Sequence, residues 1–133
     1  MAVLYRVMRA DPDDGLPIVV AGKRWALGVR TDGPRPDIVP TDGIVGPLTG
    51  GLTCAYDWRT FEPGMLPKPF GGTARHEVLF EIDEELARHA LGVRKDEPPP
   101  GHHVLEPRHR MPIEKYEALL AATRRGWRRV PEP

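Results

Sequence analysis

Residues 35–58 read RPDIVPTDGIVGPLTGGLTCAYDW, and the rest of the chain is organised around this stretch. Three prolines and the Gly50-Gly51 pair break it up before residues 52–56, a short run of strand character. This pattern is typical of an irregular but rigid loop that feeds a strand, where glycines let the backbone approach a ligand closely. We expect Thr53 at the start of the strand with its hydroxyl exposed, and an ordinary surface turn is the simpler alternative.

The chain has 133 residues and balances 19 basic against 19 acidic side chains. This length predicts one domain, residues 1–133, large enough to bury a core. The neutral balance gives no overall field that would attract nucleic acid or a membrane surface. Because no stretch approaches the roughly 20 apolar residues of a membrane span, and no secretion signal is visible, we expect a cytoplasmic protein without membrane contact.

The residue types present restrict the possible chemistry. The sequence contains no Ser, Asn or Gln, so a serine nucleophile is excluded and side-chain hydroxyls come from Thr and Tyr. The single cysteine, Cys54, excludes an internal disulfide framework, and we interpret it as a small buried apolar residue. His102, His103, His109 and Glu106 follow no metal-ligand spacing, so we expect no metal site.

Residues 3–8, VLYRVM, have the composition of a strand in which Arg6 shares a face with apolar neighbours. A guanidinium in that setting needs a carboxylate or a ligand anion as a partner, although an edge arginine that reaches water is equally consistent with the pattern. Residues 77–82 are predicted as a second strand. Residues 84–91 are predicted as a helix capped by Asp83, and residues 95–101, with three consecutive prolines, as an extended connector.

The last third of the chain predicts a strand over residues 102–106, with His102 and Glu106 on one face. A helix is then expected from Pro112 to Arg129, with acidic residues near its start and arginines near its end. Its apolar face is expected to pack on the sheet and contains Ile113, Tyr116, Leu119, Leu120 and Trp127. Strands and helices in this arrangement predict an α+β fold.

The order of these features resembles the small ADP-ribosyltransferase-like toxins delivered by bacterial type VI secretion. The likeness lies in four segments: Leu4-Tyr5-Arg6, Arg35-Pro36-Asp37-Ile38-Val39, Gly50-Gly51-Leu52-Thr53, and His102 to Pro107 followed by Met111 and a final helix with Arg124-Arg125-Gly126-Trp127. The resemblance implies an α+β fold with an ADP-ribosyltransferase-like split, mostly antiparallel β-sheet and a few flanking helices. It also implies NAD as the cofactor, an intracellular acceptor and a cognate immunity or antitoxin protein.

The resemblance implies roles for individual residues. Arg6 and Arg35 are expected to hold the dinucleotide. Thr53 is expected to supply the hydroxyl of the second motif near the nicotinamide ribose, and Tyr56 to stack on the nicotinamide unless it is a core residue. His102 matches the histidine that begins the third-motif strand.

The chain departs from the wider superfamily in its carboxylates. No Glu-x-Glu pair precedes the last predicted strand, so Glu106, or alternatively Asp57, is expected to stabilise the oxocarbenium-like ribose. Two other classes of function stay open. One is a non-catalytic module that binds a nucleotide or a protein. The other is a small nucleic-acid-binding protein that uses residues 102–129, where seven Lys or Arg face three Glu.

Overall fold

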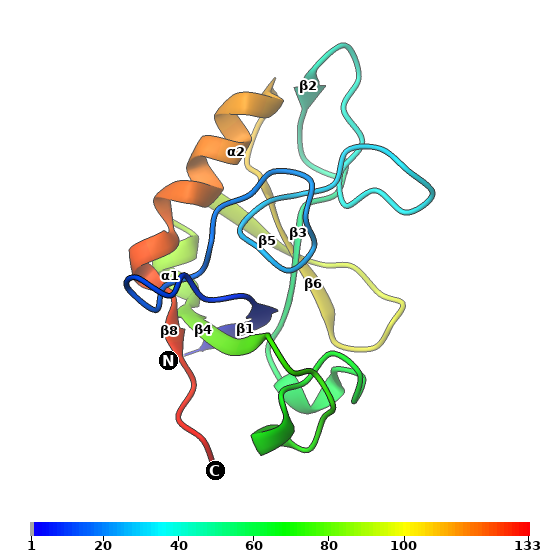
Figure 1. Cartoon of the computed structure of the whole chain (residues 1–133). Helices are drawn as coiled ribbons and strands as arrows, with labels where there is room; N and C mark the ends of the chain where they lie inside the picture. The colour runs from blue at the N-terminus through cyan, green and yellow to red at the C-terminus, as the bar shows by residue number, and fades with distance from the viewer. Residues whose placement is uncertain (1) are drawn as a thin grey trace.

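The computed structural model describes residues 2–133 of the chain, and its main feature is a six-stranded sheet (Figure 1). The strands lie in the order β5-β6-β3-β1-β4-β8, and every neighbouring pair is antiparallel. Their bounds are β1 Val3–Met8, β3 Leu52–Ala55, β4 Val78–Asp83, β5 Leu91–Lys95, β6 His102–Pro107 and β8 Arg128–Arg129. A second sheet pairs β2, Ile44–Val45, with β7, Met111–Pro112. The expected α+β class with a mostly antiparallel sheet is confirmed.

The helices are shorter than the sequence predicts. They are α1 Glu84–Ala87 and α2 Ile113–Ala122, with short 3-10 turns at η1 Trp58–Thr60, η2 Lys68–Phe70 and η3 Arg124–Gly126. The prediction of a helix over residues 84–91 is wrong beyond its first turn, because the chain re-enters the sheet as β5 and pairs with β6 over five positions. Within residues 2–133, no helix is long and apolar enough to cross a membrane.

Helix α2 packs on the sheet as expected, but it ends before the final arginines. Tyr116 and Leu120 are completely buried. After Ala122 the Thr123 hydroxyl donates to the carbonyl of Leu120 at 2.6 Å, and η3 turns the chain into β8. The predicted helix through Arg129 is therefore wrong at its end, since the chain leaves the helix to pair with β4.

The two faces of the sheet bury separate apolar clusters. Alternation along β1 directs Leu4 and Met8 into the larger cluster, which α2 covers, and Val7 into a smaller one. The smaller cluster is covered by the green segment after β3, which supplies Trp58 and Phe61 (Figure 1). Because both faces of β1 are covered, this strand is the centre of the fold.

The pairing of β1 with β3 is much shorter than its neighbours. These two strands share one register pair, Tyr5 with Ala55, whereas β3 and β6 share four and β1 and β4 share six. The backbone ladder between β1 and β3 thus joins the last residue of β3 to the middle of β1. Next to this pair the two strands are linked by the Arg6 side chain, which donates to Thr53, and the candidate site lies there.

Candidate functional site

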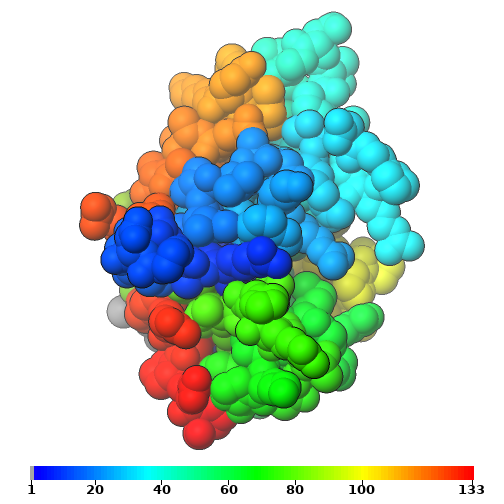
Figure 2. Space-filling view, viewed as in Figure 1, coloured from blue at the N-terminus to red at the C-terminus, as the bar shows by residue number. Residues whose placement is uncertain are grey.

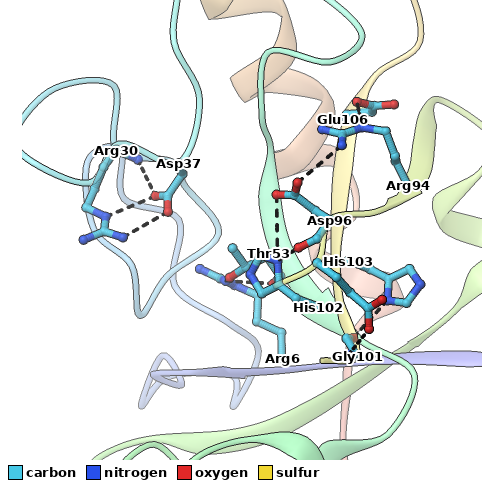
Figure 3. Close-up of polar contacts among 11 residues, drawn as sticks. Arg6, Arg30, Asp37, Thr53, Arg94, Asp96, Gly101, His102, His103 and Glu106 are labelled. Atoms are coloured by element: carbon cyan, nitrogen blue, oxygen red, sulfur yellow. Dashed lines mark hydrogen bonds and ion pairs between the residues drawn. The ribbon is translucent and has the colours of Figure 1, made fainter. Parts of the chain in front are cut away.

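Arg6 joins the two strands where their backbone pairing stops. Its Nη1 donates to both the carbonyl and the hydroxyl oxygen of Thr53, at 2.9 and 2.7 Å, although the two residues are 47 positions apart (Figure 3). Its Nη2 donates to the carbonyls of Arg24 and Ala26, at 2.6 and 3.0 Å. The sequence predicted Arg6 and Thr53 as site residues from separate motifs, and the fold brings them into direct contact.

The charge of Arg6 is buried without a carboxylate to balance it. The residue is 5% exposed, and within residues 2–133 no carboxylate is hydrogen-bonded to its guanidinium. Burial lowers the pKa of Arg6 to about 10, and the negative charge of Asp37 opposes that shift. Arg6 therefore still carries its charge at neutral pH. Its Nε is buried and has no hydrogen-bond partner, which leaves one donor unsatisfied beside the pocket.

A pocket of about 240 Å³ opens beside the contact between Arg6 and Thr53. Its walls come from β1, from the loop after β1 and from the segment after β3, and they include Arg6, Arg24, Trp25, Arg30, Asp37, Thr53, Phe61, Met65 and Glu77. Figure 2 shows the blue-to-cyan segment that follows β1 lying between α2, in orange, and the green segment that follows β3. The pocket thus combines apolar and aromatic walls with three arginines and two carboxylates.

Arg30 and Asp37 form the most extensive polar contact of the pocket wall. Arg30 Nε and Nη2 donate to the two carboxylate oxygens of Asp37, at 3.2 and 3.1 Å, and the backbone N–H of Arg30 donates to the same carboxylate at 2.7 Å (Figure 3). This contact raises the pKa of Arg30. The sequence did not predict Arg30 as a site residue, because nothing in the segment around Arg35 indicates that the partner of Asp37 lies seven residues earlier.

The hydroxyl of Thr53 keeps its proton free for a ligand. Its oxygen accepts from Arg6, so the O–H group is not the donor in that bond. A cation that donates to the oxygen polarises the hydroxyl and makes its proton a better hydrogen-bond donor. Thr53 is the second residue of β3, as expected, but it is half-buried rather than exposed, and it lines the pocket.

His102 lies on the same sheet face as Thr53, but it does not line the pocket itself. Thr53 pairs with Val104 and Ala55 pairs with His102, so His102 is a diagonal cross-strand neighbour of Thr53. Its Nδ1 lies 3.0 Å from the carbonyl oxygen of Asp96, which can only accept (Figure 3). Nδ1 is therefore the donor in this contact, and Nε2 is the ring nitrogen that offers a lone pair when the ring carries one proton. This tautomer is the one that a general base needs.

Glu106 also lies on β6, but it is not part of the pocket wall. One of its carboxylate oxygens accepts from Arg94 Nε at 2.8 Å and from the backbone N–H of Leu48 at 3.0 Å. Glu106 is 8% exposed. These contacts connect β6 to the edge strand β5 and to the loop before β3, so the geometry gives Glu106 a structural role.

Tyr56 and Arg35 lie away from the pocket. Tyr56 follows Leu52 and Cys54 in alternation and packs edge-on against His103, with ring centroids 4.6 Å apart, while its hydroxyl donates to Glu84. Arg35 is exposed at the tip of the loop that Arg30 and Asp37 close. The fold therefore brings neither of them to the contact between Arg6 and Thr53.

Two further expectations concern Asp57 and Cys54. Asp57 caps η1 by accepting from the backbone N–H of Arg59 at 3.0 Å, and it does not line the pocket. Cys54 is 2% exposed, and burial raises the pKa of its thiol to about 12. It is a buried apolar residue, as its isolated position in the sequence predicts.

The pocket carboxylates are residues that sequence reasoning did not identify. Asp37 falls within the Arg-Pro-Asp segment, but its position gave no sign that it would face the pocket. Glu77 precedes β4 and lies 3.8 Å from Arg9 Nε. The sequence does contain one feature that marks Glu77, because it is the acidic residue next to the strand that pairs with β1.

Comparison of the chain with protein-family models, with curated proteins and with solved structures finds no match.

Proposed function

We propose that the chain is a toxin that uses NAD, transferring ADP-ribose to an intracellular acceptor or hydrolysing NAD. The observation that carries this proposal is the hydrogen-bonded contact between Arg6 and Thr53 at a pocket wall. From the resemblance in sequence, Arg6 is expected to hold the dinucleotide and Thr53 to lie near its nicotinamide ribose, so both belong to one expected site. The backbone pairing of β1 with β3 through a single register pair, beside which Arg6 is hydrogen-bonded to Thr53, is compatible with the split sheet that this proposal expects.

The pocket residues fit part of NAD. A buried, uncompensated guanidinium with an unsatisfied Nε favours an anionic or polar ligand. A volume of about 240 Å³ is below the roughly 300–1,000 Å³ of pockets that enclose whole drug-sized ligands. The pocket therefore suits one portion of a dinucleotide, with the remainder lying along the surface.

The residues of the chain supply binding and proton handling. Bound NAD supplies a ribose C1′ whose bond to nicotinamide breaks with the electron pair leaving on nicotinamide, while C1′ bonds to an oxygen of water or an acceptor. The Thr53 hydroxyl orients the ribose or the carboxamide. His102 Nε2 takes the proton that the attacking oxygen loses. The carboxylate of Glu77 stabilises positive charge that develops near the pocket, since both oxygens of Asp37 already accept from Arg30.

Nicotinamide release from NAD by the purified chain tests this proposal. Thr53→Ala and His102→Ala should each remain folded and lower turnover by a factor of ~10² or more, because each removes a positioned hydrogen bond or proton acceptor. Thr53→Ser should retain most of the turnover, because the hydroxyl is kept. Thr31→Ala, at an exposed threonine, and His103→Ala are the matched controls. Full activity in folded Thr53→Ala and His102→Ala would remove both residues from the site.

The alternative of a nucleic-acid-binding protein receives little support from the charges of the C-terminal region. Arg124 forms ion pairs with Asp11 and Asp14, and Arg128 forms ion pairs with Glu81 and Asp83. These arginines therefore carry less free charge than their sequence indicates. A non-catalytic module is the remaining alternative, and measurable NAD turnover would count against it.

A further inference from the structure

Arg6 has few hydrogen-bond donors left for a ligand. Both of its terminal nitrogens donate to protein oxygens, through two bonds each. A guanidinium has five N–H donors, so the remaining donor is the buried Nε. Arg6 thus holds Thr53 and the segment of Arg24 to Ala26 in place, and it contributes positive charge to the pocket. It is a positioning residue.

Arg30 has the opposite arrangement. Its Nε and Nη2 face Asp37, while its Nη1 has no protein acceptor in the described part of the chain, residues 2–133. The Arg30 side chain is 35% exposed and lines the pocket, whereas the Asp37 side chain is 9% exposed. The carboxylate thereby fixes the plane of the guanidinium and leaves one edge of it toward solvent and the pocket. A guanidinium fixed in this way is pre-organised for a phosphate.

We propose that Arg30, oriented by Asp37, binds the phosphates of a nucleoside diphosphate moiety, so that Arg30 rather than Arg35 is the arginine of this loop that holds the dinucleotide. This inference rests on the proposed function for the identity of the complete ligand, but the phosphate contact itself can be measured separately. Arg24 adds a third guanidinium to the same wall, and Phe61 and Trp25 offer apolar surface for a ribose or a base.

The loop between Arg30 and Asp37 explains why the guanidinium keeps its position. The backbone N–H groups of Asp37 and Ile38 donate to the carbonyl of Arg30, at 2.8 and 3.3 Å, and the side-chain contacts close the same loop a second time. The N–H of Gly51 donates to the carbonyl of Asp37 at 2.9 Å, which attaches the loop to the residue before β3. Arg30 is therefore held at a fixed place relative to Thr53.

The test is calorimetric titration of the folded full chain with ADP, AMP and adenosine. We expect the wild type to bind ADP more tightly than AMP, and AMP more tightly than adenosine. Arg30→Ala should weaken ADP binding about 10- to 100-fold, the factor that corresponds to losing a charge-assisted hydrogen bond. The change in adenosine binding should be much smaller. Arg35→Ala removes the same charge from the exposed tip of the same loop and should leave the ADP affinity within about twofold.

Two further variants separate folding from binding. Arg30→Lys keeps the positive charge but loses the bidentate contact with Asp37, so it should recover only part of the ADP affinity. Arg6→Lys loses the guanidinium whose two terminal nitrogens hold Thr53 and the segment of Arg24 to Ala26. It should therefore lower the kcat of NAD turnover more than it weakens ADP binding. Thermal melts of each variant, with and without ADP, show that the measured protein is folded.

The outcomes distinguish this inference from the proposed function. Equal ADP affinity in Arg30→Ala and Arg35→Ala, or no ADP binding by the wild type, overturns the role of Arg30, whatever the NAD turnover is. ADP binding that depends on Arg30, in a chain that releases no nicotinamide, supports the role of Arg30 and rejects the NAD chemistry. Arg30-dependent ADP binding together with NAD turnover supports both.

Discussion

Residue pairs that are distant in sequence determine what the candidate site can do. Arg6 and Thr53 were predicted because each stands in a recognisable motif. Arg30 and Asp37 were not predicted as a pair, because their contact depends on a loop whose closure the local pattern does not encode. The resemblance in sequence implied that Tyr56 stacks on the nicotinamide unless it is a core residue, but alternation along the chain from β3 turns it to the face opposite Thr53, where it packs on His103. Residues that are close in the sequence of a strand can therefore lie on opposite faces of the sheet.

Glu106 gives a prediction at the same scale. Glu106→Gln keeps the shape of the side chain but removes the charge that Arg94 faces at 2.8 Å. We expect the free energy of unfolding to fall by about 1–3 kcal/mol, since a partly buried charge loses its partner. NAD turnover per folded molecule should stay near the wild-type value.

Chemical denaturation and nicotinamide release, measured on the same preparations, check this expectation. Glu114→Gln is the matched control, because Glu114 is exposed. If the Glu106→Gln protein is as stable as the wild type but has lost NAD turnover, Glu106 acts in catalysis and the structural role is wrong.

Elements with a strong local pattern were predicted well, and elements that depend on pairing were not. The strands at residues 3–8, 77–82 and 102–106 were predicted to within about two residues, because their apolar composition is clear. Strand β5 was missed, since Leu91–Lys95 contains a glycine and two basic residues and is an edge strand that depends on β6 for its partners. Secondary structure of this kind is decided by its neighbour rather than by its own residues.

The segment after α2 gives a prediction at the scale of elements. Trp127 is 1% exposed, and its Nε1 donates to the Thr123 hydroxyl at 2.9 Å, so it anchors η3 and β8 to the core. Trp127→Ala should lower the free energy of unfolding by about 3–5 kcal/mol, which is the usual cost of removing a large aromatic side chain from a core. The loss should appear in stability rather than in turnover per folded molecule.

Denaturant titration of Trp127→Ala beside Val39→Ala checks the core assignment. Val39 is 56% exposed, so its truncation should have little effect on stability. The charge reversals Arg128→Glu and Arg129→Glu test the surface of the same segment separately. If Trp127→Ala melts like the wild type and loses activity, or if the reversals alone abolish activity, this segment belongs to the functional surface.

For the whole molecule, the toxin proposal requires a neutralising partner in the producing cell. We expect a small protein that covers the mouth of the pocket on the side of the exposed Arg35 and the pocket-lining Thr53. Such a partner should compete with ADP for the chain and restore growth when the two are produced together. Cells that produce the Thr53→Ala variant should grow without the partner protein.

Co-purification from the native operon and rescue of growth by neighbouring reading frames check this expectation. Growth arrest by the wild type that no neighbouring reading frame relieves, together with isolation of the chain alone, would contradict it. The Arg6→Ala variant serves as the non-toxic reference in the same assay.

The central position of β1 has a consequence for how the protein is made. Residues 3–8 are synthesised before their partners, which are residues 78–83 on one side and the strand pair β3 and β6 on the other, complete only at Pro107. At about 5–20 residues per second, a ribosome needs roughly 5–20 s to reach that point. During this interval the apolar faces of β1 have no cover, so the nascent chain is exposed to aggregation and is a substrate for chaperones. The pocket, whose walls span Arg6 to Glu77, is complete only after residue 77 has left the ribosome, so a partly translated chain lacks the candidate site.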